Sequence, residues 1–385
     1  MYFMLIGIDA SRMAREWRTG TEAYSLHLSR ALVAAGGEHR FRLYTPAMFP
    51  PGMLNDLAAA QVENPRHEVR VIPFPRLWTH LRLAWEVSRH PPDVLFVPAH
   101  VMPLVCPVPC VVTVHDLGYL YWPEAHRRPD RWYLDWTTRR HAHLAARVIA
   151  DSQATRADLI RHYHADPERV VVVYPGRDEA LGRQDDPEAI AAVKARYNIS
   201  GRYLLFLGTL QPRKNLVRLV EAFARLAPVW DDLQLALAGK RGWLYEDLFV
   251  RVKSLGLERR VVFTGYVADQ DKAALISGAL ALVYPSLYEG FGLPLLEAMA
   301  CGTPVLTSNV SSLPEVAGDA ALLVDPLDTD AIAAGMVRLM TDVDLREALI
   351  QRGRAQVCKF SWAGAAREIL RVLETVGFDR QASHV

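Results

Sequence analysis

The 385-residue sequence predicts an α/β protein built from two doubly wound, Rossmann-like domains. Short apolar runs alternate with segments of helical period almost throughout, which is the order expected of parallel sheets with right-handed crossovers. Many of these runs are apolar at every position, as strands buried on both faces are. The length also fits two domains of roughly 100–200 residues, each large enough to enclose a core.

Thirteen apolar runs are expected to be strands. In the first half of the chain they are residues 5–8, 42–44, 69–72, 94–97, 111–114, 148–150 and 170–174. In the second half they are residues 204–207, 235–238, 261–264, 280–284, 305–307 and 322–324. Two sheets of about six strands are expected rather than one very wide sheet. Residues 21–35 and 216–227 are among the expected helices, and the second of these has a single apolar stripe.

The boundary between the domains is expected within residues 175–201, where glycines, a proline and an acidic pair interrupt the pattern. This gives an N-terminal domain at 1–178, a linker at 179–200 and a C-terminal domain at 201–360. Residues 361–385 form a further helical stretch, which periodicity assigns to neither domain. Ligands of doubly wound domains bind at the carboxyl ends of the strands, so the site is expected in a central cleft between the two domains.

Composition and charge exclude several classes of protein. Lys and Arg total 44 against 43 Asp and Glu, and the net charge of +1 argues against a nucleic-acid partner. No apolar run approaches the roughly 20 residues that span a bilayer. The N-terminus lacks the basic region of a signal peptide, so a cytoplasmic protein is expected. The four cysteines are too few for a disulfide scaffold and are not spaced as a zinc site.

The commonest motifs of doubly wound enzymes are missing from the sequence. No G-x-G-x-x-G follows a strand, and the P-loop pattern is incomplete. Neither G-x-S-x-G nor H-E-x-x-H occurs. No cofactor is therefore expected.

The most informative segment is residues 284–304. A buried strand is expected to end at Pro285, and Pro294 suits the first turn of a helix that stops at Gly302. The backbone N–H groups at the start of this helix belong to Phe291, Gly292 and Leu293. Such a helix N-terminus attracts a phosphate or a sugar oxygen.

Two glutamates flank that loop: Glu289 lies within it and Glu297 lies about one turn inside the helix. Carboxylates only accept hydrogen bonds, so two adjacent hydroxyl groups of a sugar can donate to one of them. The alternative is that Glu297 is solvated and that Glu289 only supports the loop.

A second strand-to-helix turn carries Arg213 and Lys214, with Asn215 as the expected N-cap. The two cations would lie beside a helix N-terminus and form a pocket for a diphosphate. Lysine is scarce in this chain, with six in total and none before Lys194. A lysine at this turn is therefore less easily explained by chance. A solvated turn is the alternative.

Two positions in the first domain give weaker signals. Gly20 follows the first strand and would present its amide in the cleft, but Thr19 and Glu22 around it fit a capping box that explains the segment structurally. His115 lies at the carboxyl end of a strand, where a packing role explains it as well as a catalytic one.

The segment from Glu289 to Glu297 resembles the E-x7-E signature of retaining glycosyltransferases of family four, which have the GT-B fold. The resemblance extends to Gly20-Thr-Glu22, His115-Asp116, Ala150-Asp151-Ser152, Gly208 to Asn215, Ala238 to Trp243 and Phe263 to Val267. The E-x7-E block together with the Arg-Lys turn is specific, whereas the other segments are weak singly. Residues 115–124 look most similar to bacterial mannosyl- and rhamnosyltransferases that build surface polysaccharides.

This resemblance implies a role for each matching position. Arg213 and Lys214 would neutralise the diphosphate of the donor. Glu289 would bind hydroxyls of the transferred sugar, and Glu297 would bind the ribose. Further donor contacts would come from Gly20, Gly265, Tyr266, Val267, Phe291, Gly292 and Leu293, with His115 against the sugar. The tail from residue 360 would cross back to the N-terminal domain.

The expected reaction moves a hexose from a nucleotide diphosphate sugar with retention, by same-face attack and without a metal ion. No D-x-D metal motif precedes the expected site. The resemblance favours GDP-mannose as the donor, with a UDP-hexose as the second choice. Three further readings stay open: a sugar-nucleotide epimerase, a glycosidase and a non-enzymatic sugar-binding protein.

A glycan or a lipid-linked acceptor is expected on the N-terminal domain. Residues 1–150 have a net charge of +4 and the remainder −3, so the expected acceptor-side domain is the basic one. From Arg127 to Arg147 there are six arginines and two aspartates, with Trp132, Tyr133 and Trp136 among them. A second cluster holds Arg76, Trp78, Arg82, Trp85 and Arg89. These residues suit peripheral contact with anionic lipid at the inner face of the cell membrane. A solvated face with buried tryptophans is an equal alternative.

Overall fold

The computed structural model describes residues 3–14, 20–49, 67–99 and 101–382. The chain divides into two compact units, each formed around one parallel sheet. Unit 1 consists of Met1–Leu117, Arg128–Gly176 and Phe360–Val385. Unit 2 consists of Gly118–Arg127 and Arg177–Lys359. Thr19 of the expected capping box lies outside the described residues.

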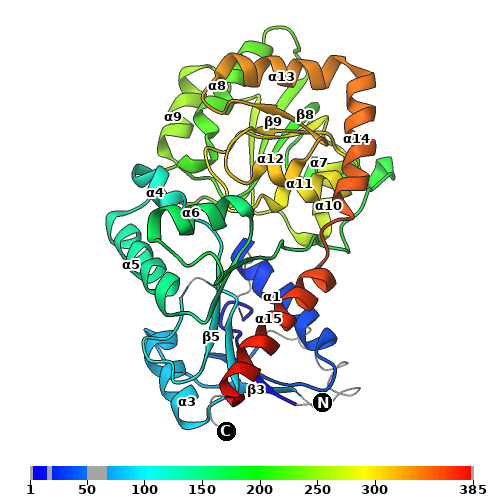
Figure 1. Cartoon of the computed structure of the whole chain (residues 1–385). Helices are drawn as coiled ribbons and strands as arrows, with labels where there is room; N and C mark the ends of the chain where they lie inside the picture. The colour runs from blue at the N-terminus through cyan, green and yellow to red at the C-terminus, as the bar shows by residue number, and fades with distance from the viewer. Residues whose placement is uncertain (1–2, 15–19, 50–66, 100, 383–385) are drawn as a thin grey trace. The chain divides into compact units, whose positions relative to one another are not determined.

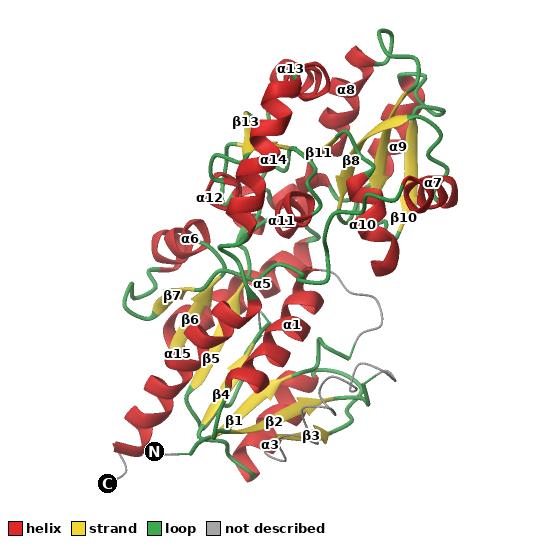
Figure 2. Cartoon of the chain, turned by 90° about the vertical axis from the view of Figure 1, so that its right-hand side faces the viewer, coloured by secondary structure: helices red, strands yellow, loops and turns green. Residues whose placement is uncertain are grey.

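Unit 1 has a seven-stranded sheet in the order β3-β2-β1-β4-β5-β6-β7, and every described pairing is parallel. The strands are β1 Leu5–Asp9, β2 Arg40–Thr45, β3 His67–Val71, β4 Val94–Val97, β5 Cys110–Val114, β6 Arg147–Ala150 and β7 Val170–Val172. The order reverses between β1 and β4, which is the arrangement of a doubly wound sheet. Figure 2 shows these strands as one twisted sheet.

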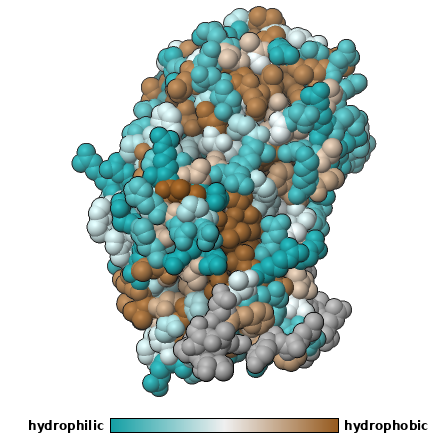
Figure 3. Space-filling model, viewed as in Figure 1, coloured by the Kyte–Doolittle hydropathy of each residue, from teal (hydrophilic) through white to brown (hydrophobic). Residues whose placement is uncertain are grey.

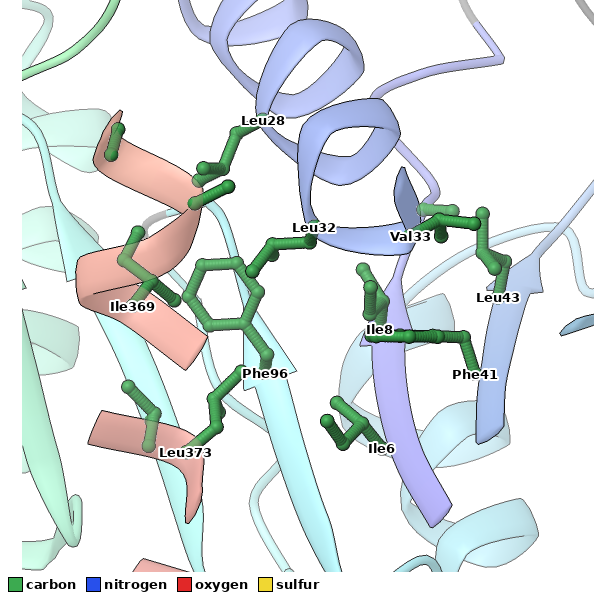
Figure 4. Close-up of a cluster of buried hydrophobic side chains, with 14 of the residues drawn as sticks. Ile6, Ile8, Leu28, Leu32, Val33, Phe41, Leu43, Phe96, Ile369 and Leu373 are labelled. Carbon is green, nitrogen blue, oxygen red and sulfur yellow. The ribbon is translucent and has the colours of Figure 1, made fainter. Parts of the chain in front are cut away.

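Most helices of unit 1 lie between successive strands of its sheet, and the last one returns to unit 1 from unit 2. They are α1 Gly20–Ala35, the π-helical turn η1 Thr79–Leu83, α3 Ala84–Arg89, α5 Arg128–Leu144, α6 Gln153–Tyr163 and α15 Trp362–Ala382. Figure 4 shows side chains of α1, α15 and three strands pointing into one hydrophobic cluster, in which Leu32, Phe96 and Leu373 are fully buried. The last helix of the chain therefore completes the core of the unit that contains the first strand.

Unit 2 has a six-stranded sheet in the order β10-β9-β8-β11-β12-β13, again with parallel pairings only. The strands are β8 Arg202–Leu207, β9 Leu233–Ala238, β10 Val261–Gly265, β11 Ala281–Tyr284, β12 Val305–Ser308 and β13 Ala321–Val324. The order reverses between β8 and β11, so loops that follow these two strands meet at the usual ligand position of such a sheet.

Helices of unit 2 alternate with its strands along the chain as far as β13, and two further helices follow that strand (Figure 1). They are α4 Gly118–Tyr121, α7 Pro187–Arg196, α8 Leu216–Leu226, α9 Glu246–Ser254, α10 Asp269–Ser277, α11 Leu293–Ala300, α12 Leu313–Ala317, α13 Thr329–Thr341 and α14 Val343–Val357. Two 3₁₀ turns, η2 Pro123–Ala125 and η3 Pro212–Lys214, complete the unit. No helix in the described part of the chain is both long enough and apolar enough to span a bilayer.

All thirteen expected strands are present, and the expected pair of doubly wound, parallel-sheet domains is confirmed. Two boundaries differ from expectation. Residues 179–200, expected to be a linker, contain α7, which packs on α10 because Arg196 and Tyr197 both bind Asp271. Residues 118–127, expected within the N-terminal domain, pack in unit 2 instead.

Candidate active site

The reversal point of the unit 2 sheet brings a lysine and a glutamate into direct contact. Lys214 ends the 3₁₀ turn after β8, and Glu289 lies in the loop after β11. The Lys214 Nζ atom donates to Glu289 Oε1 and to the hydroxyl of Tyr284, each at 2.5 Å. Because β8 and β11 are neighbouring parallel strands, their carboxyl ends meet at one edge and fix this pairing.

This pair is buried: Lys214 is 7% exposed and Glu289 is 6% exposed. Burial alone would raise the pKa of Glu289, but the positive charges of Lys214 and Arg213 outweigh burial and lower that pKa. Glu289 is therefore a carboxylate at neutral pH. Arg213 lies next to Lys214 and is buried as well, so the turn holds two cations against one anion.

Tyr284, the last residue of β11, supports the lysine. Its ring stacks on Phe206 of β8, with centroids 5.5 Å apart and planes 9° apart. Lys214 also lies over the Tyr284 ring, with Nζ 4.9 Å from its centroid. Burial raises the pKa of Tyr284 well above its usual value, so the phenol stays neutral. Motif reasoning missed this residue, although its place at the end of β11 was visible in the sequence.

Two serines hold the loop that contains Glu289. Ser311 Oγ accepts from the backbone N–H of Glu289 at 2.9 Å, and Ser312 Oγ donates to the carbonyl oxygens of Glu289 and Phe291. Gly292, which has φ +114°, then begins the turn into α11, in a region that favours glycine. Neither serine was predicted, because their contacts are set by the neighbouring strand β12.

Helix α11 begins at Leu293 with Pro294 in its first turn, as expected, and it is followed by Gly302 at φ +68°. Glu297 lies on this helix and receives a hydrogen bond from Lys272 Nζ of α10 at 2.9 Å. The charge of Glu297 raises the pKa of Lys272. Lys272 is a second residue that sequence reasoning missed, since it belongs to no motif.

The remaining predicted donor residues of unit 2 follow β10. Gly265 is the last residue of that strand at φ +72°, Tyr266 is half-buried and Val267 is buried. The carbonyl of Gly265 accepts from the N–H of Gly239, which follows β9. These residues lie in the unit that holds Lys214 and Glu289, and their segment leads into the helix of Lys272.

The N-cap expected at the Arg-Lys turn is confirmed in position but not in its side-chain contact. Asn215 occupies the N-cap position of α8 but has a left-handed backbone (φ 60°) and makes no side-chain cap. Its amide instead donates to the carbonyl oxygens of Pro285 and Pro326, and its carbonyl oxygen accepts from Arg218. Asn215 thus ties the turn to the residue that follows β11.

In unit 1, His115 lies at the carboxyl end of β5 beside Asp151 at the end of β6. The parallel register pairs Val114 with Ala150, so the next residue of each strand comes together. His115 Nδ1 is 2.7 Å from Asp151 Oδ2, and its Nε2 is 3.2 Å from the carbonyl oxygen of Pro98. Burial lowers the pKa of His115, but the charge of Asp151 outweighs it and the pKa is raised.

Gly20 is the first residue of α1 and is exposed. An added Cβ there would meet no atom within 4 Å, so packing does not require a glycine at this position. His115 and Gly20 belong to unit 1, whereas the other predicted site residues belong to unit 2. Within the described ranges, no group of three or more His, Cys, Asp or Glu side chains is arranged to hold a metal ion.

Both halves of the chain match models of known protein families. Residues 18–181 match Glycosyltransferase Family 4, and residues 192–356 match Glycosyl transferases group 1. The chain is 32% identical over 370 residues to the O-antigen chain mannosyltransferase B of Escherichia coli, covering 91% of this chain and 95% of that protein. It is 30% identical to the serotype-specific mannosyltransferase WbdA of E. coli, covering 88% of this chain and 45% of that protein.

Solved structures agree on the fold. Anabaena Alr3699/HepE in complex with UDP-glucose superposes with a TM-score of 0.76 at 20% identity, covering 97% of this chain and all of that one. WaaG, a glycosyltransferase involved in lipopolysaccharide biosynthesis, gives a TM-score of 0.72 at 19% identity over 96% of this chain and 99% of that one. These solved structures show the fold, and the family models with the E. coli mannosyltransferase B match show that the chain is a glycosyltransferase and belongs to glycosyltransferase family 4.

Proposed function

We propose that this glycosyltransferase moves a hexose from a nucleotide diphosphate sugar to a glycan or lipid-linked acceptor, with retention of the anomeric configuration. GDP-mannose is the favoured donor. The observation that carries the proposal is the buried Lys214–Glu289 contact beside Arg213, at the reversal point of the unit 2 sheet. A glycosidase needs paired carboxylates but no such pair of cations. Because the chain belongs to a glycosyltransferase family, the glycosidase alternative is no longer supported.

The two cations match the charge that develops on the donor. When the anomeric C–O bond breaks, negative charge grows on the departing nucleoside diphosphate. Arg213 and Lys214 stabilise that charge from fixed positions in a buried turn, where electrostatic interactions are stronger than in water. They supply this stabilisation without a metal ion, so we propose metal-independent transfer.

Glu289 binds and orients the sugar rather than acting as a base. A carboxylate whose pKa is lowered is a weak proton acceptor, and its contact with Lys214 also weakens it as a nucleophile. We therefore propose same-face attack: the acceptor oxygen forms the new bond to the anomeric carbon while the bond to the diphosphate breaks. The proton of the acceptor hydroxyl goes to the departing phosphate oxygen.

The remaining assignments follow the same proposal. Glu297, held by Lys272, accepts from the ribose hydroxyls. The segment from Gly265 to Val267 flanks the nucleobase, and the amides of Phe291, Gly292 and Leu293 contact the sugar and phosphate. Gly20 and His115 remain donor-side proposals in unit 1.

The donor assignment rests on the two E. coli relatives, which are named mannosyltransferases. A UDP-hexose is the second candidate, because the proposed contacts with the nucleobase come largely from backbone and backbone discriminates bases poorly. HepE was solved with UDP-glucose, but at 20% identity it supports the fold alone.

A nucleotide screen tests the donor proposal directly. GDP, UDP, ADP and their sugars are added to the purified chain, and the unfolding temperature is measured; GDP and GDP-mannose are expected to give the largest increases. Transfer is then assayed with the favoured sugar, and NMR of the product is expected to show the anomeric configuration of the donor. A protein that no nucleoside diphosphate stabilises would contradict the proposal.

Substitution tests the diphosphate-binding residues. Arg213→Ala and Lys214→Ala are each expected to lower turnover by about 10²–10³-fold, the usual cost of removing one fixed charge-stabilising group. Exposed Lys253 lies on α9 and serves as the matched control, so Lys253→Ala should leave turnover unchanged. Normal turnover in both site variants would rule out the cationic turn as the diphosphate site.

We further propose peripheral contact with anionic lipid through unit 1. Helix α5 carries most of the basic segment between Arg127 and Arg147, and Trp132 on it is 70% exposed rather than buried. His80 of η1 hydrogen-bonds to Tyr133 of α5 at 2.7 Å, so η1 and α5 lie side by side.

The second basic and aromatic cluster supports the same contact. Phe74, Leu81, Arg82 and Trp85 line a hollow of about 420 Å³, and Trp85 is 54% exposed. The guanidinium of Arg82 lies 4.8 Å from the centre of the Trp85 ring. Figure 3 shows hydrophobic side chains among hydrophilic ones at the lower left, where α3 lies in Figure 1. Trp78, by contrast, is buried.

Liposome co-sedimentation tests this contact. Vesicles with about a third of anionic phospholipid should bind the chain at low salt, and Trp85→Ser with Trp132→Ser should weaken binding without lowering the unfolding temperature. Neutral vesicles are the control. Equal sedimentation of the chain with neutral and anionic vesicles, or with neither, would contradict the proposal.

A further inference from the structure

A ten-residue segment follows β5 in the chain but packs in unit 2. We call Gly118–Arg127 the strap; it contains α4 and the 3₁₀ turn η2. Leu117 before it and Arg128 after it both belong to unit 1. The strap is therefore joined in sequence to one unit at both ends, while its side chains pack with residues of unit 2.

The first contact of the strap is with the cationic turn. A Cβ atom added to Gly118 would lie 3.0 Å from both Cδ and Nη1 of Arg213 and 3.2 Å from Cδ1 of Tyr288. Gly118 does not have a left-handed backbone, and it begins a helix, so the backbone there accepts an alanine. Glycine at position 118 is therefore explained by the space available and not by the backbone conformation, because the Arg213 side chain lies directly against it.

Two further contacts hold the strap in this place. The ring of Tyr121 stacks on Tyr288, with centroids 5.2 Å apart and planes 21° apart. Trp243 Nε1 donates to the carbonyl oxygen of Ala125 at 2.5 Å, and its ring lies 6.0 Å from that of His126. The strap thus binds unit 2 at its beginning through Gly118 and Tyr121 and near its end through Ala125 and His126.

The contacts of Gly118 and Tyr121 lie beside the proposed diphosphate site without belonging to its ion pair. Tyr288 immediately precedes Glu289 in the chain, and the N–H of Leu287 donates to the carbonyl oxygen of Arg213 at 2.9 Å. The strap therefore lies on the side chain of Arg213 and on the residue next to Glu289. An arginine has many rotamers, and a wall against its guanidinium restricts them before a ligand arrives.

We infer that the strap is a positioning element for Arg213, and that its docking on unit 2 is coupled to the binding of a nucleoside diphosphate. This inference rests on the proposed role of Arg213 in binding the donor diphosphate. The strap itself acts through Arg213 and does not touch the ligand. By linkage, if docking of the strap increases affinity for the diphosphate, the diphosphate must stabilise the docked strap to the same extent.

Gly118→Ala tests the inference with the smallest change. The added methyl group requires the Arg213 side chain to move by a few tenths of an ångström, and kcat/KM for the donor and affinity for GDP and UDP are each expected to fall about tenfold. Gly182→Ala is the matched control in the same unit, since its added Cβ would meet no atom within 4 Å and its φ is not left-handed. The inference would be overturned if Gly118→Ala had the wild-type unfolding temperature and also the wild-type kcat/KM and nucleotide affinity.

A double-mutant cycle separates positioning from general packing. In an Arg213→Ala background, Gly118→Ala is expected to cause no further loss of GDP or UDP affinity, because its target is gone. Losses that add would show that the strap acts independently of Arg213. If Arg213→Ala by itself leaves nucleotide affinity unchanged, the proposed diphosphate role fails; if it weakens affinity but Gly118→Ala does not, only the role of the strap fails.

Hydrogen exchange tests the reciprocal effect. Saturating GDP should slow exchange of the strap amides in the wild-type chain and should not do so in Arg213→Ala. Tyr121→Phe preserves the stacked ring and should keep this protection, whereas Tyr121→Ala should lose it. Wild-type strap amides that exchange at the same rate with and without bound nucleotide would overturn the coupling.

Discussion

Each unit holds an acid–base pair at the carboxyl ends of its strands, and the two pairs differ in position. In unit 2, Lys214 and Glu289 follow β8 and β11, between which the strand order reverses. In unit 1, His115 and Asp151 follow β5 and β6, beyond the reversal at β1 and β4. Only the first pair therefore occupies the position where doubly wound sheets bind ligands.

The two pairs also differ in how much hydrogen-bonding capacity they leave for a ligand. An ammonium has three donors and a carboxylate about four acceptor sites, so Lys214 and Glu289 can bind a ligand and keep their own contact. An imidazole has two ring nitrogens, and those of His115 already lie against Asp151 and the carbonyl of Pro98. The unit 2 pair therefore keeps more hydrogen-bonding capacity for a ligand than the unit 1 pair, whose His115 is proposed only to lie against the donor sugar.

The largest expected effects concern the unit 2 pair. Lys214→Met should reduce turnover by about 10²–10³-fold. It should also lower the free energy of unfolding by about 3–5 kcal/mol, because it leaves Glu289 buried without its main counter-charge. Glu289→Gln should reduce turnover strongly with a smaller loss of stability, since the amide oxygen still accepts from Lys214. Steady-state kinetics and denaturant unfolding measure both effects.

The double variant Lys214→Met/Glu289→Gln sharpens this prediction. It removes both charges and should recover most of the stability lost in Lys214→Met, while activity stays at the level of the worse single variant. Recovery of activity together with stability would mean that the Lys214–Glu289 pair has a structural role only.

The next effect concerns the unit 1 pair. Asp151→Ala should lower the free energy of unfolding by about 1–3 kcal/mol, because His115 loses a partner in a largely buried place. Donor affinity and turnover should fall by less than in Lys214→Met. Asp151→Asn, whose amide oxygen can accept from Nδ1, should recover part of the stability. A loss of turnover as large as that of Lys214→Met at unchanged stability would place His115 in direct contact with the reaction.

The fold was predictable because its signal is local. Strands buried on both faces must be apolar at every position, so β4, β5, β9 and β11 were recognisable as runs without any partner. The strap was not predictable, because its place depends on contacts of Gly118 and Ala125 with residues about a hundred positions away. Helix α7 was missed because glycines, a proline and acids around it also suit a linker.

Residues of the proposed site also divide into those predictable from local sequence and those that were not. Lys214 and Glu289 were predictable because each follows a strand within a motif, and parallel pairing brings the two ends together. Lys272, Ser311 and Ser312 were not, because their roles depend on which helix or loop lies opposite. Asn215 was placed correctly at the start of α8, but its side chain binds two carbonyl groups instead of capping the helix.

The two pairs should respond to pH in opposite directions. The pKa of His115 is raised above its ordinary 6.5, so its stabilising contribution is complete below that value and is lost as pH rises through the folded pKa. Burial raises the pKa of Asp151 above its ordinary 3.8, so its contribution to stability also decreases as pH rises through its folded pKa. The pKa of Glu289 is lowered below 4.5, so its contribution is present above that value and is lost as pH falls through the folded pKa.

Variants make the two contributions measurable. The stability difference between the wild type and His115→Gln should be largest below about pH 6.5 and shrink on the alkaline side, by roughly 1 kcal/mol per unit of pKa shift. The difference for Glu289→Gln should be constant from about pH 5 upward and shrink in acid. Chemical unfolding at a series of pH values provides both curves. Curves that shrink on the same side would contradict the distinction between the two pairs.

The smallest effect is expected for the third pair, Lys272 and Glu297, which is more exposed than the Lys214 pair. Partly exposed ion pairs contribute about 0.2–1 kcal/mol, so Lys272→Met should raise the KM for the donor by no more than about fivefold and leave kcat unchanged. Lys272 orients the Glu297 carboxylate, which is proposed to bind the ribose equally in the ground state and the transition state. Loss of such a contact raises KM and leaves kcat unchanged. Lys253→Met, at an exposed lysine of the same unit, is the control. A fall in kcat at unchanged KM would instead place Lys272 with Lys214, among the groups that stabilise the departing diphosphate.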